Sequence, residues 1–217
     1  MSERVVLYGA GGFGRELSSY LERDPCGFAG KDVVFVDDVL ARDSFARRPC
    51  FSWSEFVGSQ SGGKPFVVFV TAGSGDVRRR IVERLSMDNV TIGSYIDSRA
   101  FVSGEAVIGE GSVICPFVTI TSNAKIGVGF QANIYSYVAH DCRVGDYVTL
   151  APGAKINGNV VLDDHSYVGT GAVVKQGKLG APVVIGEHAV VGMGAVVTKS
   201  VPSGATVVGN PARIVGS

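Results

Sequence analysis

Every sixth position from residue 96 to residue 174 is aliphatic or alanine. The series is Ile96, Val102, Ile108, Ile114, Ile120, Ile126, Ala132, Val138, Val144, Leu150, Ile156, Leu162, Val168 and Val174. Four residues after each of these positions, up to residue 172, comes a small or apolar side chain, and only Phe130 among them is large. A period of six fits neither the 3.6-residue α-helix nor the simple alternation of a strand.

This period predicts a coil with three flat sides of six residues each, the hexapeptide-repeat parallel β-helix. The aliphatic residue of each side points inward, the small residue fits near a corner, and successive coils stack like parallel strands. After Val174 the next aliphatic step falls on Leu179, five residues on, and the period resumes through Ile185, Val191 and Val197. We therefore expect one residue to be missing at residues 175–178. The coils should end near residue 202, and residues 201–217 should cap the stack.

The chain before the repeats has a different pattern. Apolar strands are expected at residues 5–8, 33–36 and 65–70, with helices at about 15–21 and 76–85. Gly9, Gly11 and Gly14 form G-x-G-x-x-G between a strand and a helix, the setting in which this motif binds a phosphate. Asp37 and Asp38 end the second strand, where an acidic residue commonly binds ribose or base.

A second glycine-rich turn at residues 71–75 follows the third strand. We expect residues 1–92 to form a small α/β, Rossmann-like nucleotide-binding domain and residues 93–217 the β-helix. So short a domain suits one mononucleotide better than NAD. A plain tight turn without a ligand is the alternative for the first motif. The arginines at 78–80 are expected to form a solvated helix face, with phosphate contact as the alternative.

Composition narrows the function further. Twenty basic residues balance twenty acidic ones, so there is no electrostatic case for nucleic acid or an anionic membrane. No apolar run is long enough for a membrane span, and no signal peptide is recognisable. The four cysteines lack metal or disulfide spacing, and Cys142 falls on an inward small position. A cytoplasmic protein is expected.

The sequence has three histidines, so each can be considered in turn as a candidate functional residue. His165 and His188 fall on outward positions and are expected to be solvated. His140 precedes Asp141, which makes it the one general-base candidate, although a surface His–Asp pair is the alternative. Gly158 lies eighteen residues on, one full coil, so its N–H is a candidate oxyanion donor. Histidine gaps of 25 and 23 residues argue against a three-histidine metal site.

The whole chain resembles the bacterial sugar O-acyltransferases named for sialic acid O-acetylation, and especially the sugar-nucleotide N-acetyltransferases of the bacillosamine and perosamine type. The residues that carry the resemblance are the stretches 8–14 (YGAGGFG), 36–38 (VDD), 139–146 (AHDCRVGD), 151–154 (APGA), 192–199 (GMGAVVTK) and 208–212 (VGNPA). An N-terminal nucleotide lobe combined with His-Asp-Cys is the most specific part.

The resemblance implies a left-handed helix, a homotrimer with active sites between subunits, and transfer from acetyl-CoA, without a metal, to a nucleotide-linked amino sugar. His140 would be the base, Asp141 its orienting acid, and Gly158 the donor to the thioester carbonyl. The other implied contacts are Gly11, Gly12, Phe13, Asp37, Asp38 and Gly73 for the nucleotide, Asn133 for the acceptor sugar, and Thr149, Gly158, Thr170 and Met193 for CoA.

Two positions depart from the family pattern. Thr149 stands where some relatives have a CoA-contacting histidine, and Asp97 where many have a histidine in a His-Pro-Ser-Ala turn. The expected reaction is direct attack of the sugar's 4-amino group on acetyl-CoA. O-acetylation of a sugar or sialic acid is the first alternative, since the same base accepts either proton. A non-catalytic β-helix scaffold and a dehydrogenase are more remote.

Overall fold

The computed structural model describes residues 4–25, 27–39, 48–60 and 65–215. The chain divides into two compact units, Met1–Ser94 and Tyr95–Ser217, and each is described by itself. The predicted domain boundary after residue 92 stays a prediction. Residues on both sides of it bond to the first unit: Val68 donates to the Thr91 carbonyl, and Gly93 donates to that of Val68. None of the helices in the described ranges has the length and apolar character that a membrane span requires.

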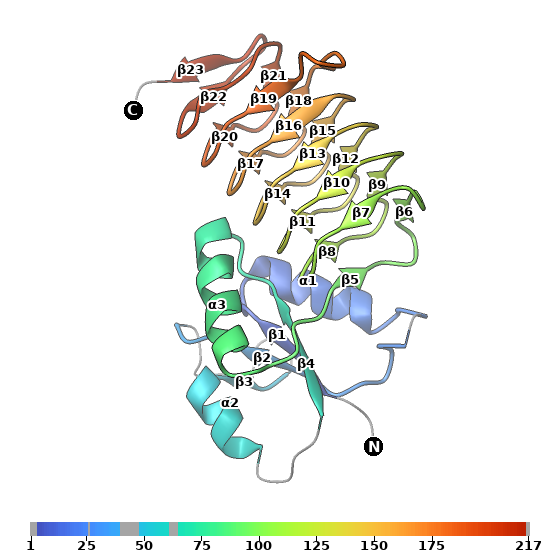
Figure 1. Cartoon of the computed structure of the whole chain (residues 1–217). Coiled ribbons are helices and arrows are strands. Elements are labelled where there is room, and N and C mark those ends of the chain that lie inside the picture. The colour runs from blue at the N-terminus through green and yellow to red at the C-terminus, as the bar shows by residue number, and fades with distance from the viewer. Residues whose placement is uncertain (1–3, 26, 40–47, 61–64, 216–217) are drawn as a thin grey trace. The chain divides into compact units, whose positions relative to one another are not determined.

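The first unit is built on a four-stranded parallel sheet of order β3-β2-β1-β4. Its elements are β1 (Arg4–Tyr8), α1 (Gly12–Leu21), β2 (Val33–Val36), β3 (Cys50–Phe51), α2 (Trp53–Ser59), β4 (Phe66–Val70) and α3 (Gly75–Met87) (Figure 1). The strands are near-continuous apolar runs because both sheet faces are buried. One face packs against α2 and α3 through Trp53, Phe56 and Leu85.

Neither α2 nor β3 was predicted from the sequence, although a local signal for α2 is present. Ser52 and Glu55 form a capping box: the Ser52 hydroxyl accepts from the Glu55 N–H, and the Glu55 carboxylate accepts from the Ser52 N–H. This Ser-x-x-Glu pattern marks a helix start when an apolar run follows it.

The second unit is a stack of three-sided coils whose sides form three sheets (Figure 1). The first sheet contains β7 (Val107–Ile108), β10 (Lys125–Ile126), β13 (Arg143–Val144), β16 (Val160–Leu162) and β19 (Val183–Ile185). The second contains β5 (Tyr95–Ile96), β8 (Val113–Ile114), β11 (Gln131–Ala132), β14 (Thr149–Leu150), β17 (Tyr167–Val168), β20 (Val190–Val191), β22 (Thr206–Val208) and β23 (Arg213–Val215). The third contains β6 (Phe101–Val102), β9 (Thr119–Ile120), β12 (Tyr137–Val138), β15 (Lys155–Ile156), β18 (Val173–Val174) and β21 (Val196–Val197).

The hexad prediction is confirmed in its register. Strands pair in parallel with partners eighteen residues away, as in Ala132 with Leu150 and Val138 with Ile156. The aliphatic positions are buried from Ile114 to Val174, and so are the small positions from Ser112 to Ala172, including Phe130 and Cys142. Ile96 is 42% exposed because it lies in the first coil, which has no coil of its own stack beneath it. The interior of the stack is therefore a continuous apolar column of repeated positions, as expected for a hexapeptide-repeat parallel β-helix.

The irregularity after Val174 is an insertion, and the prediction of a missing residue was wrong. The next inward residue is Ile185, eleven positions after Val174, and Val160 pairs with Val183, twenty-three residues on. The extra residues leave the coil, so Leu179 is 93% exposed where we expected it to point inward. A loop outside the coil disturbs no packed layer, whereas a shortened corner would strain one.

The two ends of the stack are closed differently. At the last coil β22 continues the parallel sheet, and β23 folds back antiparallel to it. At the first coil, Asp97 accepts hydrogen bonds from the Tyr95 hydroxyl and from Arg99, the latter through two side-chain nitrogens and the main chain. Burial alone would raise the pKa of Asp97, but these donors hold it below its ordinary value. Asp97, one of the two positions that depart from the family pattern, therefore stabilises the first coil of this chain.

Candidate active site

His140 and Asp141 form the centre of the candidate site, at the corner between β12 and β13. The Asp141 Oδ2 lies 2.8 Å from His140 Nδ1, and the Asn123 side chain, one coil below, donates to Asp141 Oδ1 at 2.7 Å. The Asn123 hydrogen bond and the one from His140 hold the pKa of Asp141 below its ordinary value. An ionised carboxylate that accepts from Nδ1–H leaves Nε2 of the ring with its lone pair available.

Gly158 lies against this imidazole, as the coil spacing predicted. A Cβ at this position would be 2.5 Å from His140 Cε1 and Nε2, so only glycine leaves room for the ring. The Gly158 carbonyl accepts from the Gly177 N–H, and the next amide, Asn159, donates to the His140 carbonyl. Among the described residues the Gly158 N–H has no hydrogen-bond partner. An acceptor nitrogen and an uncommitted amide therefore lie on adjacent coils.

The corner that carries these residues has a demanding backbone. Asn123, Asp141 and Asn159 stack there with φ of 57°, 60° and 57°. Asn and Asp tolerate this left-handed conformation better than most residues, which explains their repetition at eighteen-residue spacing. The same corner thus presents one amide or carboxylate on each coil.

Cys142, two residues after the histidine, is fully buried and is not available as a nucleophile. Its thiol donates to the Asn157 carbonyl at 3.2 Å, and burial raises its pKa to about 11. At pH 8 only about one thiol in a thousand would be ionised, and the thiolate is the reactive form.

We expect iodoacetamide at pH 8 to leave Cys142 of the folded protein unmodified, as read by peptide mass spectrometry. Guanidinium-unfolded protein is the control, in which Cys142 should react fully. Equal labelling in both states would contradict its burial.

Three of the four residues expected to contact CoA, Thr149, Thr170 and Met193, lie elsewhere on the coil, whereas Gly158 lies against His140. Thr170 and Met193 are exposed residues on adjacent coils. Thr170 lies at the corner between β17 and β18, and its carbonyl accepts from the N–H of Gly194, the residue after Met193. Thr149 is 7% exposed within β14. Half-buried Asn133 donates from its side chain to the Leu150 carbonyl, which braces the coil. Within one chain the structure does not bring Thr170 and Met193 to the corner that carries His140.

The other two histidines stack on each other. The rings of His165 and His188 lie 4.7 Å apart and nearly parallel, and His165 also stacks on Tyr147. The side chain of His188 is 48% exposed, as predicted, but His165 is partly buried in this column and is not simply solvated. Considering each unit separately, no three His, Cys, Asp or Glu side chains in the described ranges are close enough to share a metal ion.

In the first unit, the glycine motif forms a tight turn between β1 and α1. Gly9 has φ +122°, and a Cβ at Gly14 would collide with the Gly9 carbonyl, so both positions require glycine. Space is open at Gly11 and Gly12, and α1 begins without a side-chain cap. Free N–H groups at a helix start are a ready site for an anion.

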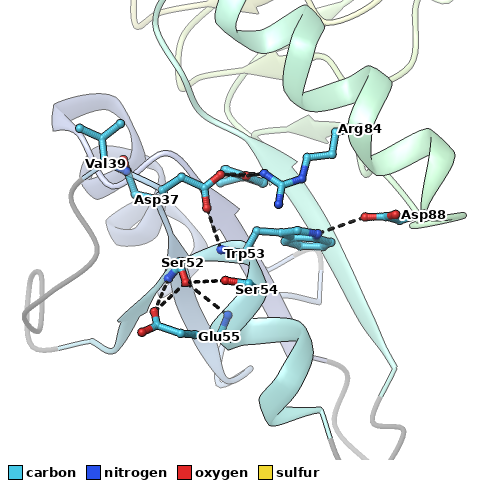
Figure 2. A network of polar contacts seen from close by, with 10 residues as sticks. Asp37, Val39, Ser52, Trp53, Ser54, Glu55, Arg84 and Asp88 are labelled. Carbon is cyan, nitrogen blue, oxygen red and sulfur yellow. Dashed lines mark hydrogen bonds and ion pairs between the residues drawn. The ribbon is translucent and has the colours of Figure 1, made fainter.

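Asp37 and Asp38 are committed to internal bonds rather than standing free. Asp37 accepts from the N–H groups of Ala10 and Val39, each at 2.9 Å, and so holds the glycine turn. Asp38 accepts from the Tyr8 hydroxyl at 2.6 Å, from Arg84 at 2.8 Å and from the Trp53 N–H at 2.9 Å. Figure 2 shows Trp53 in this network, with Asp88 at its indole N–H and Arg84 reaching in from α3.

This network sets the protonation of its members. Burial would raise the pKa of Asp38, but the hydrogen bonds from Tyr8, Trp53 and Arg84 hold it below its ordinary value. Burial, followed by the hydrogen bond to Asp38, raises the pKa of Tyr8 well above its usual range. Tyr8 therefore remains a neutral donor. The roles of Tyr8, Trp53 and Arg84 in this network were not predicted from the sequence. The position of Tyr8 next to the glycine motif was the one available signal.

A cavity of about 350 Å³ opens beside this network, a size typical of small-molecule sites. It is lined by Tyr8, Gly9, Asp37, Asp38, Val39, Ala72, Val77, Arg80, Ile81 and Arg84. Gly11, Gly12, Gly73 and half-buried Phe13 do not line it, although space is open at all three glycines. Arg78, expected on a solvated face, is 1% exposed and donates to the Ala72 and Gly73 carbonyls, so it braces the second glycine-rich turn.

Comparisons with known proteins identify the family. No family profile matches the chain. It is 46% identical to a GDP-perosamine N-acetyltransferase of Escherichia coli O157:H7 over 95% of this chain and 94% of that protein. The chain belongs to the hexapeptide-repeat acyltransferases.

Three solved structures of similar proteins match over nearly the whole chain. WeeI from Acinetobacter baumannii AYE has a TM-score of 0.92 at 46% identity, covering 99% of this chain and all of that one. The acetyltransferase domain of PglB from Neisseria gonorrhoeae, in complex with acetyl coenzyme A, has a TM-score of 0.85 at 30% identity, with 99% and 100% coverage. PerB from Caulobacter crescentus, in complex with CoA and GDP-perosamine, has a TM-score of 0.85 at 26% identity, with 98% and 97% coverage.

Proposed function

We propose that this acyltransferase transfers the acetyl group of acetyl-CoA to the amino group of a GDP-linked amino deoxysugar. The carrying observation is that His140, oriented by Asp141, lies against the uncommitted amide of Gly158. Similarity to proteins named for GDP-perosamine over almost the full length supports the substrate class. O-acetylation of a sugar or sialic acid becomes the less favoured alternative, because the full-length relative from Escherichia coli is named as an N-acetyltransferase of an amino sugar nucleotide.

The mechanism follows from the positions of these groups. The neutral sugar amine attacks the thioester carbonyl, and His140 Nε2 takes a proton from the nitrogen as the C–N bond forms. The Gly158 N–H donates to the oxyanion of the tetrahedral intermediate. The intermediate collapses with cleavage of the C–S bond, and the CoA thiolate leaves and can take the proton from the imidazolium. Asp141 holds the imidazole in the required tautomer and stabilises its charged form.

The site is proposed to be complete only in a homotrimer. Thr170 and Met193 lie at a different corner from His140 in one chain, so a neighbouring copy is needed to place both sets around one acetyl-CoA. We further propose that the coil is left-handed and that residues 1–92 form a Rossmann-like nucleotide-binding domain. Its uncapped α1 start would receive phosphate, and the cavity beside Asp37 and Asp38 would receive the nucleoside. The cytoplasm, which supplies acetyl-CoA and sugar nucleotides, is the proposed compartment.

A thermal-shift screen with CoA present tests the acceptor. GDP-, UDP- and dTDP-linked 4-amino deoxysugars are compared, and thiol release from acetyl-CoA is measured with each. We expect the GDP-linked sugar to raise the melting temperature by several degrees at about one hundred times Kd, because binding to the folded state stabilises it by about 2.7 kcal/mol. The UDP- and dTDP-linked sugars should give smaller shifts and slower turnover. A larger effect with UDP or dTDP would overturn the GDP assignment, and no thiol release with any acceptor would overturn the transfer reaction.

A further inference from the structure

A second pocket lies beside the catalytic pair on the outer surface of the coil. It has a volume of about 340 Å³, and three cationic side chains, Lys125, Arg143 and Lys178, line it together with one carboxylate, Asp141. Asn123 and Asn159 contribute amide groups. Both Asp141 oxygens are already engaged, one by Asn123 and the other by His140. The pocket therefore has an excess of positive charge at neutral pH.

The described residues provide no counter-ion for these three cations. Across the ranges that the structure describes, the side chains of Lys125, Arg143 and Lys178 make no hydrogen bond or ion pair. Lys125 and Arg143 are direct register partners on β10 and β13, so two like charges face each other across one ladder step. Such a pair is destabilising by itself. A bound anion between the two side chains would reverse the sign of that interaction.

The inserted hairpin brings the third cation to this pocket. Lys178 and Ala181 exchange two main-chain hydrogen bonds of 3.0 and 2.9 Å, which close a tight turn with Gly180 at φ +76°. Lys178, Leu179 and Gly180 of this turn line the pocket. The insertion is joined to the catalytic coil as well, because Gly177 N–H donates to the Gly158 carbonyl. The loop that the periodic pattern did not predict thus forms one wall of a cationic pocket next to the proposed base.

We propose that this pocket binds a phosphate group of a substrate, held by Lys125, Arg143 and Lys178. The inference rests on the proposed function for the identity of the substrates. Both of them carry phosphate: acetyl-CoA has a 3′-phosphate and a diphosphate, and the acceptor has a nucleoside diphosphate. A phosphate suits the site because it accepts several charge-assisted hydrogen bonds at once. Its position beside Asp141 would hold a substrate within reach of the His140 imidazole.

Binding measurements on matched variants test the pocket. The double variant Arg143→Gln with Lys178→Gln removes two of the cations and keeps side chains of similar polarity. Lys175→Gln is the control, because Lys175 is exposed near the same hairpin but does not line the pocket. Dissociation constants are measured for CoA, dephospho-CoA and GDP by calorimetry, and melting temperatures are recorded with and without inorganic pyrophosphate.

We expect pyrophosphate to raise the melting temperature of the parent protein and of Lys175→Gln by more than that of the double variant, which keeps only the proposed phosphate site at the start of α1. The double variant should bind the relevant substrate about tenfold more weakly, and added salt should reduce the difference. Weaker binding of CoA with unchanged dephospho-CoA would identify the 3′-phosphate as the ligand. Equal weakening of both forms of CoA would identify its diphosphate, and weakening of GDP alone would identify the acceptor.

Dissociation constants within twofold of the control for all three ligands, with the same pyrophosphate shift in the double variant as in Lys175→Gln, would overturn the proposal. This failure is distinct from a failure of the proposed function. Thiol release by the parent protein tests the transfer reaction without reference to the pocket, whereas pyrophosphate binding needs no turnover.

Discussion

Replacing His140 with Asn is expected to lower kcat by about 10²–10⁴-fold, the usual contribution of a general base. Asparagine preserves much of the polarity of the site but cannot accept a proton at Nε2, the nitrogen that lies against Gly158 in the parent protein. The Kd for acetyl-CoA should change little, because the imidazole acts on the acceptor amine. Single-turnover thiol release with a GDP-linked amino sugar measures the chemical step, and calorimetry measures binding.

His188→Asn is the matched control for this variant. His188 has the same exposed side-chain fraction as His140, 48%, and it too has an acidic neighbour in the sequence, Glu187, whose carboxylate lies 3.7 Å from its Nε2. It should keep nearly full turnover. If His140→Asn also kept turnover within threefold of the parent protein, His140 would not be the base and the pair with Asp141 would be only a surface contact.

Gly158→Ala is expected to lower kcat by about 10²–10⁴-fold without unfolding the protein, because it keeps the main-chain N–H but displaces the general base. The added methyl group would lie 2.5 Å from Cε1 and Nε2 of His140, so the ring must rotate away from its position beside the amide. The half-exposed side chain has solvent into which it can move, so the coil should be retained. Steady-state kinetics give the loss, and circular dichroism with thermal melting checks the fold.

The control is Gly104→Ala, where an added Cβ meets no atom within 4 Å and the backbone is not in the left-handed region. This variant should leave both turnover and stability nearly unchanged. A normal kcat in Gly158→Ala would show that the placement of the His140 imidazole beside the Gly158 amide is not needed for catalysis. An unfolded Gly158→Ala protein would instead show that the close contact serves the coil, which contradicts the role proposed for it.

Structure could be predicted from the sequence where the chain repeats itself. Coil register followed from the six-residue period, and the placement of Gly158 over His140 followed from counting eighteen residues. Both succeed because each coil repeats the environment of the one beneath it. The inward orientation predicted for Leu179 was wrong, because an aliphatic residue that happens to fall near the period looks the same in the sequence whether it points inward or outward.

The candidate nucleotide site was predicted less completely. Its glycine turn was recognisable because the backbone geometry requires Gly9 and Gly14. The roles of Asp38 and Arg78 were not, because they depend on partners far along the chain or on burial: Asp38 binds Tyr8 and Arg84, and Arg78 is folded back onto its own turn. A charged residue on a helix has the same local pattern whether its side chain is buried or solvated.

Sequence alone determined the β-helix, its inward residues and the pairing of His140, Asp141 and Gly158, because these depend on local spacing that each coil repeats. Tertiary structure decided what the charged side chains contact. It placed Lys178 of the insertion in one pocket with Lys125 and Arg143, and it separated Thr170 and Met193 from His140 by a corner of the coil. Charge–charge distances and burial arise only when distant segments come together in three dimensions, and no periodic pattern along the chain encodes them.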